Sequence, residues 1–190
     1  MPEDIFDIVN NNDEVIGQKP RSVVHTEGLK HRAVHVLVFN AAGNVFLQKR
    51  SENKDNNPGV WDSSCSGHVD SGESYEVAAE RELMEEIDLL VEQPLEPLFK
   101  IDACENTGQE FVWVYQTVHE GPFTLNPDEL DDGQWFETAE IEDALAEEII
   151  NTTMEDELTK LGILRDKYNE VSMKITTKGM KKTEHSILRY

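Results

Sequence analysis

Residues 67–89 of the chain read GHVDSGESYEVAAERELMEEIDL, a glycine-containing loop followed by a strongly acidic segment with a helical pattern. Neither Gly nor Pro interrupts residues 73–87, and this composition favours a helix. Ala79, Leu83 and Ile87 recur every four residues and form an apolar stripe that can pack on a sheet. The segment therefore predicts a helix with one buried side.

The same helix carries three carboxylates on one side, because Glu82 lies three and four residues before Glu85 and Glu86. Like charges at this spacing destabilise a helix. Arg81 can pair with Glu85 and with Glu73, which leaves Glu82 and Glu86 without a partner nearby in the sequence. A solvated acidic face would explain three glutamates alone. Joined to the glycine loop and the internal arginine, the pattern favours a bound Mg²⁺, which prefers oxygen ligands.

This segment resembles the Nudix box, whose pattern is Gly, five residues, Glu, seven residues, then Arg-Glu-apolar-any-Glu-Glu-any-Gly-apolar. The positions that match in register are Gly67, Glu73, Arg81, Glu82, Leu83, Glu85, Glu86 and Leu89. Asp88 stands where the family has a Gly that ends the helix at positive φ. Asp tolerates the left-handed region better than most residues, so we expect an intact helix end. The resemblance extends to Pro58-Gly59-Val60-Trp61 and covers about residues 4 to 140.

The rest of the pattern mixes strands with helices. Residues 5–10 and 15–20 flank a turn rich in Asn and Asp and predict a hairpin. Apolar runs predict strands over residues 33–39, 45–49, 98–103 and 110–118, the last being central because both of its faces are apolar. Pro94 and Pro97 predict a chain break, residues 67–72 a loop, and residues 139–150 and 155–168 helices.

These elements indicate the α+β class, and the resemblance implies a Nudix-like α/β/α sandwich with a central mixed β-sheet flanked by helices. We expect a Nudix hydrolase domain over residues 1–150, including the hairpin of residues 5–20. A C-terminal helix and a tail rich in lysine would occupy residues 151–190.

The resemblance implies a magnesium-dependent hydrolase, with Mn²⁺ as a possible substitute, that cleaves a diphosphate bond by attack of water on phosphorus. The implied metal ligands are Glu82, Glu85, Glu86 and the carbonyl oxygen of Gly67. Either Glu85 or Glu86 would act as the general base. Arg81 and Glu73 would hold the loop to the helix.

Within this superfamily the chain is similar to the branch that contains isopentenyl-diphosphate isomerase. That resemblance implies a possible second metal site, suited to zinc or manganese, formed by His25, His31, His68 and Glu110. Two departures argue against isomerase activity. Ser66 replaces the proton-donating cysteine directly before the box Gly, with Cys65 one place earlier, and Gly108 replaces a second acidic residue. If neither cysteine has a catalytic role, we expect Cys65 and Cys104 to be small buried apolar residues.

Four residues are candidates for contacts with the substrate. Arg32 and Lys49 flank the 33–49 strand pair and could reach phosphates. Trp61 could stack on a base or belong to the core. Glu129 stands where many relatives keep a late carboxylate near the metals, and a turn cap is the alternative.

Composition limits the partners. The net charge of -22 and a pI near 4.5 disfavour binding to nucleic acid. We expect a cytoplasmic protein, because the two cysteines make no disulfide framework and neither a signal peptide nor a membrane-length apolar run is evident. A homodimer is possible.

Three functions remain. The first is hydrolysis of a nucleoside diphosphate-linked or similar small molecule. The second is isopentenyl-diphosphate isomerisation, and the third is a non-catalytic nucleotide-binding module. The complete box favours hydrolysis.

Overall fold

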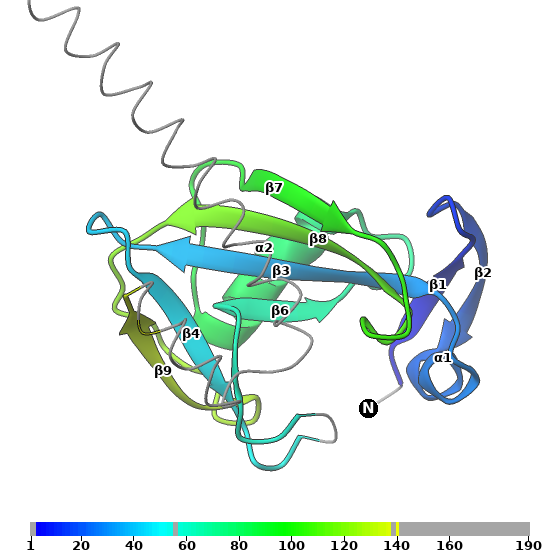
Figure 1. Cartoon of the computed structure of the whole chain (residues 1–190), viewed down its shortest axis with the longest axis horizontal. Coiled ribbons are helices and arrows are strands. Elements are labelled where there is room, and N and C mark those ends of the chain that lie inside the picture. The colour runs from blue at the N-terminus through cyan, green and yellow to red at the C-terminus, as the bar shows by residue number, and fades with distance from the viewer. Residues whose placement is uncertain (1–2, 55–56, 138–139, 141–190) are drawn as a thin grey trace, which may run out of the picture. The chain divides into compact units, whose positions relative to one another are not determined.

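Two parallel strands form the middle of a mixed sheet (Figure 1). β3 (His31–Phe39) pairs in parallel with β8 (Glu110–Val118), from His31 opposite Glu110 to Phe39 opposite Val118. β7 (Glu96–Ile101) runs antiparallel to β8, which confirms β8 as a central strand. The protein is seen here in a computed structural model that describes residues 3–54, 57–137 and 140.

The remaining strands of the sheet surround β3 and β4 (Val45–Arg50). β4 and β6 (Cys65–His68) both pair antiparallel with β3. β5 (Trp61–Asp62) and β9 (Leu130–Phe136) pair antiparallel with β4. Among the described residues this makes one seven-stranded mixed sheet, as the α+β prediction requires.

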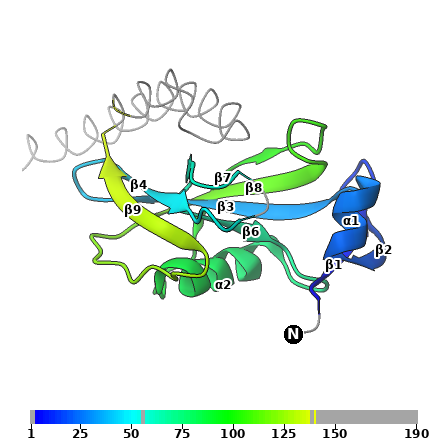
Figure 2. The same ribbon diagram turned by 90° about the horizontal axis from the view of Figure 1, so that it is seen from below.

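Helix α2 (Tyr75–Ile87) packs on one face of this sheet (Figure 2). Its predicted apolar stripe is confirmed, because Ala79, Leu83 and Ile87 are all fully buried in the main core. The hydroxyl of Ser74 accepts the Val77 N–H and caps the start of the helix. Asp88 ends it with a φ of 55°, in the left-handed conformation expected where the family has Gly.

The predicted N-terminal hairpin is present as β1 (Ile5–Val9) and β2 (Val15–Pro20). It is followed by α1 (Arg21–Glu27), a short helix that the sequence did not predict. Both lie at one end of the sheet in Figures 1 and 2. Phe6, Ile8 and Val24 form a separate small core there.

Three expectations were wrong in detail. The loop predicted from Gly67 begins later, because β6 continues to His68. β7 contains Pro97, which was predicted to break the chain. Pro97 lies at a bulge between β7 and β8, where a missing N–H is tolerated. Cys104 is exposed, whereas Cys65 is fully buried as predicted.

The helices predicted over 139–150 and 155–168 and the boundary after residue 150 lie outside the described residues. In the part of the chain that is described, no helix is long and apolar enough to cross a membrane.

Asp13, at the tip of the hairpin, anchors it to the sheet and to α2. Its carboxylate accepts hydrogen bonds from Arg32 Nε at 2.6 Å and from the Tyr75 hydroxyl at 2.8 Å. Lys100 of β7 forms a third contact with the same carboxylate. These contacts lower the pKa of Asp13 although burial opposes the shift. Arg32 is therefore committed to a structural ion pair in this conformation.

Asp13→Asn should lower the free energy of unfolding by about 2 kcal/mol, because Arg32 and Lys100 then lose their counter-charge in a partly buried place. Asn tolerates the positive φ of 60° at this position, so the effect of the charge is isolated. Urea unfolding measures the change, with Asp102→Asn on an exposed site as the control. Equal midpoints for Asp13→Asn and the wild type would contradict this role.

Candidate active site and metal centres

Arg81 connects the loop before α2 to the carboxylates on the helix. Its guanidinium binds both oxygens of Glu73, from Nε at 3.0 Å and from Nη2 at 2.9 Å. Nη1 donates to Glu82 at 2.7 Å and to Glu85 at 3.0 Å. Nη2 also donates to the carbonyl oxygen of His68 at 2.9 Å. The predicted pairs with Glu73 and Glu85 are confirmed, and the expectation that Glu82 has no local partner was wrong.

Gly67 is required because the Glu82 carboxylate lies directly against it. A Cβ atom at position 67 would overlap the carboxylate carbon and both oxygens of Glu82. The absence of a side chain therefore lets β6 approach α2 closely enough for the predicted ligands Gly67 and Glu82 to be neighbours.

Glu86 is buried beneath this surface, with 5% of its area exposed. The Ser66 N–H donates to its carboxylate at 3.0 Å, and the Cys65 thiol is a second partner. Burial raises the pKa of Glu86 to about 7, and nearby Asp62 adds to the effect against these hydrogen bonds. Burial and the charge of Glu86 raise the pKa of Glu82 to about 8.

A buried carboxylate and a largely buried one that repel each other are stabilised by a proton or a cation between them. The predicted ligands are carboxylates and a carbonyl, so all of them offer hard oxygen atoms. Glu85, whose side chain is 57% exposed, lies one helical turn after Glu82. The donor set and its suppressed ionisation therefore fit Mg²⁺.

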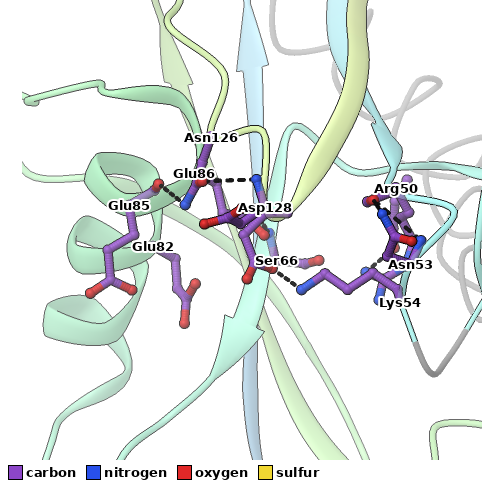
Figure 3. A network of polar contacts seen from close by, with 12 residues as sticks. Arg50, Asn53, Lys54, Ser66, Glu82, Glu85, Glu86, Asn126 and Asp128 are labelled. Atoms are coloured by element: carbon purple, nitrogen blue, oxygen red, sulfur yellow. Dashed lines mark hydrogen bonds and ion pairs between the residues drawn. The ribbon is translucent and has the colours of Figure 1, made fainter. Parts of the chain in front are cut away.

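Two loops face these glutamates (Figure 3). The 124–126 loop binds the carbonyl oxygens at the end of α2. The Asn126 N–H donates to the backbone carbonyl oxygen of Glu86 at 2.9 Å, and the Asn126 side-chain amide donates to that of Glu85 at 3.2 Å. From the other side Lys54 pairs with Glu129, and its charge also acts on Glu86. Lys54 thus connects Glu129 to the surroundings of the box, and the predicted role of Glu129 near the metals stays a prediction. Lys54 itself was not singled out from the sequence.

The other predicted substrate contacts lie elsewhere. Lys49 on β4 pairs with Trp61 on β5, and the next pair in the same ladder is Gln48 with Asp62. Because side chains alternate along a strand, Lys49 and Trp61 project from the face opposite to α2. There the Trp61 ring packs edge-on against Phe136 at 5.0 Å. Their contact with substrate stays a prediction.

The predicted second metal site is brought together by the fold. Each of His25, His31 and His68 places one nitrogen within 4.8 Å of the others. Glu110 Oε1 lies 3.1 Å from His68 Nε2 and 3.3 Å from His31 Nε2. Burial raises the pKa of Glu110, but the two neighbouring histidines lower it by more, so that the net shift is downward. Desolvation and the neighbouring imidazoles lower the pKa of His25 to about 4, so His25 is neutral near pH 7.

The hydrogen bond at Nδ1 of His31 leaves its Nε2 available to a metal ion. Its Nδ1 lies 2.9 Å from the carbonyl oxygen of Leu29, which only accepts hydrogen bonds, so Nδ1 carries the proton. In a neutral imidazole the lone pair is then on Nε2. Nε2 is buried and has no hydrogen-bond partner among the described residues, although Glu110 is close. A cation between these two acceptors would satisfy both.

Phe6 of the hairpin packs against this cluster, a contact that the sequence did not predict. Its ring stacks on His68 at 4.7 Å and on His31 at 5.8 Å between centroids. No local sequence signal marks this contact, because Phe6 is more than twenty residues from either histidine.

Comparisons with known proteins identify the family. The sequence model of the NUDIX domain matches residues 29–156. The chain belongs to the Nudix family. A protein of Yersinia pestis that is named as an uncharacterized Nudix hydrolase is 34% identical over 138 residues, which are 71% of this chain and 74% of the relative. An isopentenyl-diphosphate Delta-isomerase of Aromatoleum aromaticum is 32% identical over 140 residues, with 72% and 79% covered.

A solved structure supports the fold assignment of this Nudix chain. The crystal structure of DR0079 from Deinococcus radiodurans superposes with a TM-score of 0.72 at 28% identity. The match covers 82% of this chain and 97% of the other.

The metal-free Nudix domain should lose stability as pH rises from about 5 to 8. Folded Glu86 and Glu82 hold protons up to pKa values of about 7 and 8, whereas unfolded glutamates release them near 4.5. The folded state therefore binds more protons in this window, and each extra proton lowers stability by about 1.4 kcal/mol per pH unit.

Chemical denaturation in a chelating buffer measures this slope. Glu82→Gln should flatten it, and added Mg²⁺ should restore stability at the alkaline end. A metal-free stability that rises with pH across this window would contradict the assignment.

Proposed function

We propose that this protein is a Mg²⁺-dependent hydrolase that cleaves the phosphoanhydride bond of a nucleoside diphosphate-linked or similar small molecule. The observation that carries the proposal is the pair of Glu86, which is buried and accepts the Ser66 N–H, and Glu82, whose side chain is 12% exposed and lies against Gly67 and Arg81. Membership of a family whose relatives include proteins named as hydrolases supports it.

The proposed metal ligands differ in how deeply they are buried. Glu82, Glu86, exposed Glu85 and the Gly67 carbonyl oxygen would hold Mg²⁺. When bound there, Mg²⁺ would supply Lewis-acid chemistry that polarises phosphate oxygens and makes water more acidic. Glu85 or Glu86 accepts the proton of the attacking water. Arg81 keeps Glu82 and Glu85 on one side of the helix by binding both.

Lys54 supplies positive charge from the opposite side of the site. The lysine pairs with Glu129 and acts electrostatically on Glu86 and Glu82. We infer that Lys54 exchanges Glu129 for a phosphate oxygen when substrate binds. The acidic surface of the domain then does not prevent an anion from binding, because the metal and Lys54 together offset its charge.

Isomerisation is a second candidate, since some relatives carry that name and the histidine cluster has the corresponding residues. The register of β6 argues against it. Ser66 lies opposite His35, on the face that also carries His68, while Cys65 lies opposite Val36 in the core beneath α2. The side of the strand that carries the histidine site therefore offers a hydroxyl where that reaction needs a thiol.

Glu86→Gln should reduce turnover by about 10³-fold with the fold intact, because a buried ligand or general base is lost. A first screen measures phosphate or pyrophosphate release from nucleotides, sugar nucleotides, dinucleotides and isopentenyl diphosphate with Mg²⁺. The best substrate is then used for the variant. Glu80→Gln, on an exposed position of the same helix, is the matched control.

Each outcome of the screen has a meaning. Conversion of isopentenyl diphosphate to its allylic isomer without release would replace hydrolase by isomerase. Tight binding with neither reaction would indicate a nucleotide-binding module. Full activity in Glu86→Gln would remove Glu86 from the mechanism.

We also propose that His25, His31, His68 and Glu110 bind a second divalent ion, zinc or manganese. His31→Ala and His68→Ala should each weaken metal affinity by more than about tenfold. Competition with a chromogenic chelator measures the affinity, and metal analysis of the purified protein gives the stoichiometry. His119→Ala, on the exposed end of the sheet, is the control. Equal affinity in all variants would place the ion elsewhere.

A further inference from the structure

Gln48 of β4 has a buried amide without a structural partner. The residue is fully buried, and neither Oε1 nor Nε2 has a hydrogen-bond partner within residues 3–54, 57–137 and 140. Burying both ends of an amide without hydrogen bonds lowers stability, and such groups are rare in folded proteins. An apolar side chain of the same size would avoid this cost, so the position calls for a functional explanation.

The sheet register places Gln48 on the face that carries the box. Gln48 is paired directly with Asp62 in the antiparallel β4–β5 ladder, so both side chains project from the same face. Phe46, two residues earlier on β4, packs in the core together with α2. Asp62 is close enough to Glu86 for their charges to interact. The amide therefore lies on the same side of the sheet as the proposed metal ligands.

Donors from one stretch of chain face the acids of α2. Arg50 lies two residues after Gln48 on the same face and donates to Asp62 at 3.5 Å, and Lys54 follows in the next loop. Figure 3 shows Arg50 and Lys54 on the side opposite to Glu82, Glu85 and Glu86. Because Gln48 has no exposed surface in this structure, its amide can contact a substrate diphosphate held between the metal ligands and these cations only when neighbouring side chains move aside.

We propose that Gln48 binds the substrate by donating its amide N–H to a non-bridging phosphate oxygen. This inference rests on the proposed function, because it names a contact within the same site. A neutral donor suits the position. A carboxylate there would repel both Asp62 and phosphate, whereas an amide next to Asp62 adds no negative charge. The missing structural partner is then supplied by the substrate.

Gln48→Met tests the proposal, since methionine keeps the length of the side chain and removes the amide. Affinity for methylenediphosphonate, a diphosphate that cannot be hydrolysed, is measured by calorimetry with Mg²⁺ present. We expect affinity to fall by about tenfold, as for the loss of a hydrogen bond to a charged group. The thermal midpoint of the ligand-free variant should equal or exceed that of the wild type, because no structural hydrogen bond is lost.

The matched control is Gln116→Met on β8. Gln116 belongs to the face opposite to α2 and donates to Glu96 at the protein surface, so its replacement should leave affinity unchanged. A lower thermal midpoint for ligand-free Gln48→Met would mean that the amide has a structural role, and would overturn the proposal. Unchanged affinity for methylenediphosphonate in Gln48→Met would overturn it equally.

The binding measurement separates this inference from the proposed function. A wild type that binds methylenediphosphonate but hydrolyses no diphosphate would refute the hydrolase and leave the Gln48 contact standing if Gln48→Met binds more weakly. A wild type that binds no diphosphate with Mg²⁺ would overturn both.

Discussion

The contacts of Arg81 are the constraint on which the site depends. One guanidinium binds Glu73 in the loop, Glu82 and Glu85 on the helix, and the carbonyl oxygen of His68 at the end of β6. A planar fork of five donors can satisfy these acceptors together, and an ammonium group cannot. Because the loop carbonyl and the helix carboxylates share one cation, the strand, the loop and the helix are fixed relative to one another before a metal binds.

Arg81 does not solve the charge problem of Glu86. It offsets part of the repulsion among Glu73, Glu82 and Glu85, but Glu86 lies deeper and relies on the Ser66 N–H and the Cys65 thiol. Neutral donors compensate a buried anion only partly, so the pKa of Glu86 remains raised. The folded chain therefore keeps a buried carboxylate whose ionisation is unfavourable, at a position where a divalent cation would stabilise its charge. Evolution towards stability alone would replace such a residue.

The sequence predicted the elements whose signals are local and missed those that depend on distant contacts. Spacing within α2 predicts which glutamates share a side, because helix geometry relates neighbours three and four residues apart. Helix α1 was missed, since Arg21–Glu27 is short and rich in β-branched residues that do not favour helices. The contacts of Asp13 with Arg32, Tyr75 and Lys100 join four separate elements, and no sequence period encodes such a meeting. The grouping of His31 with Glu110 was expected only from the family resemblance, because it depends on strand register, which tertiary packing decides.

Strand β6 links the two groups of candidate ligands. Its side chains alternate, so Cys65 and Gly67 face α2 and the box, while Ser66 and His68 face the histidine cluster. The N-terminal hairpin then supports both sides of this junction. Asp7 accepts hydrogen bonds from the Ser71 hydroxyl at 2.8 Å and the Gly72 N–H at 3.2 Å, which holds the box loop, while the adjacent Phe6 covers His31 and His68. Because the adjacent residues Asp7 and Phe6 contact the box loop and the histidine cluster respectively, a displacement of β1 would disturb both. The hairpin is therefore part of the site's framework.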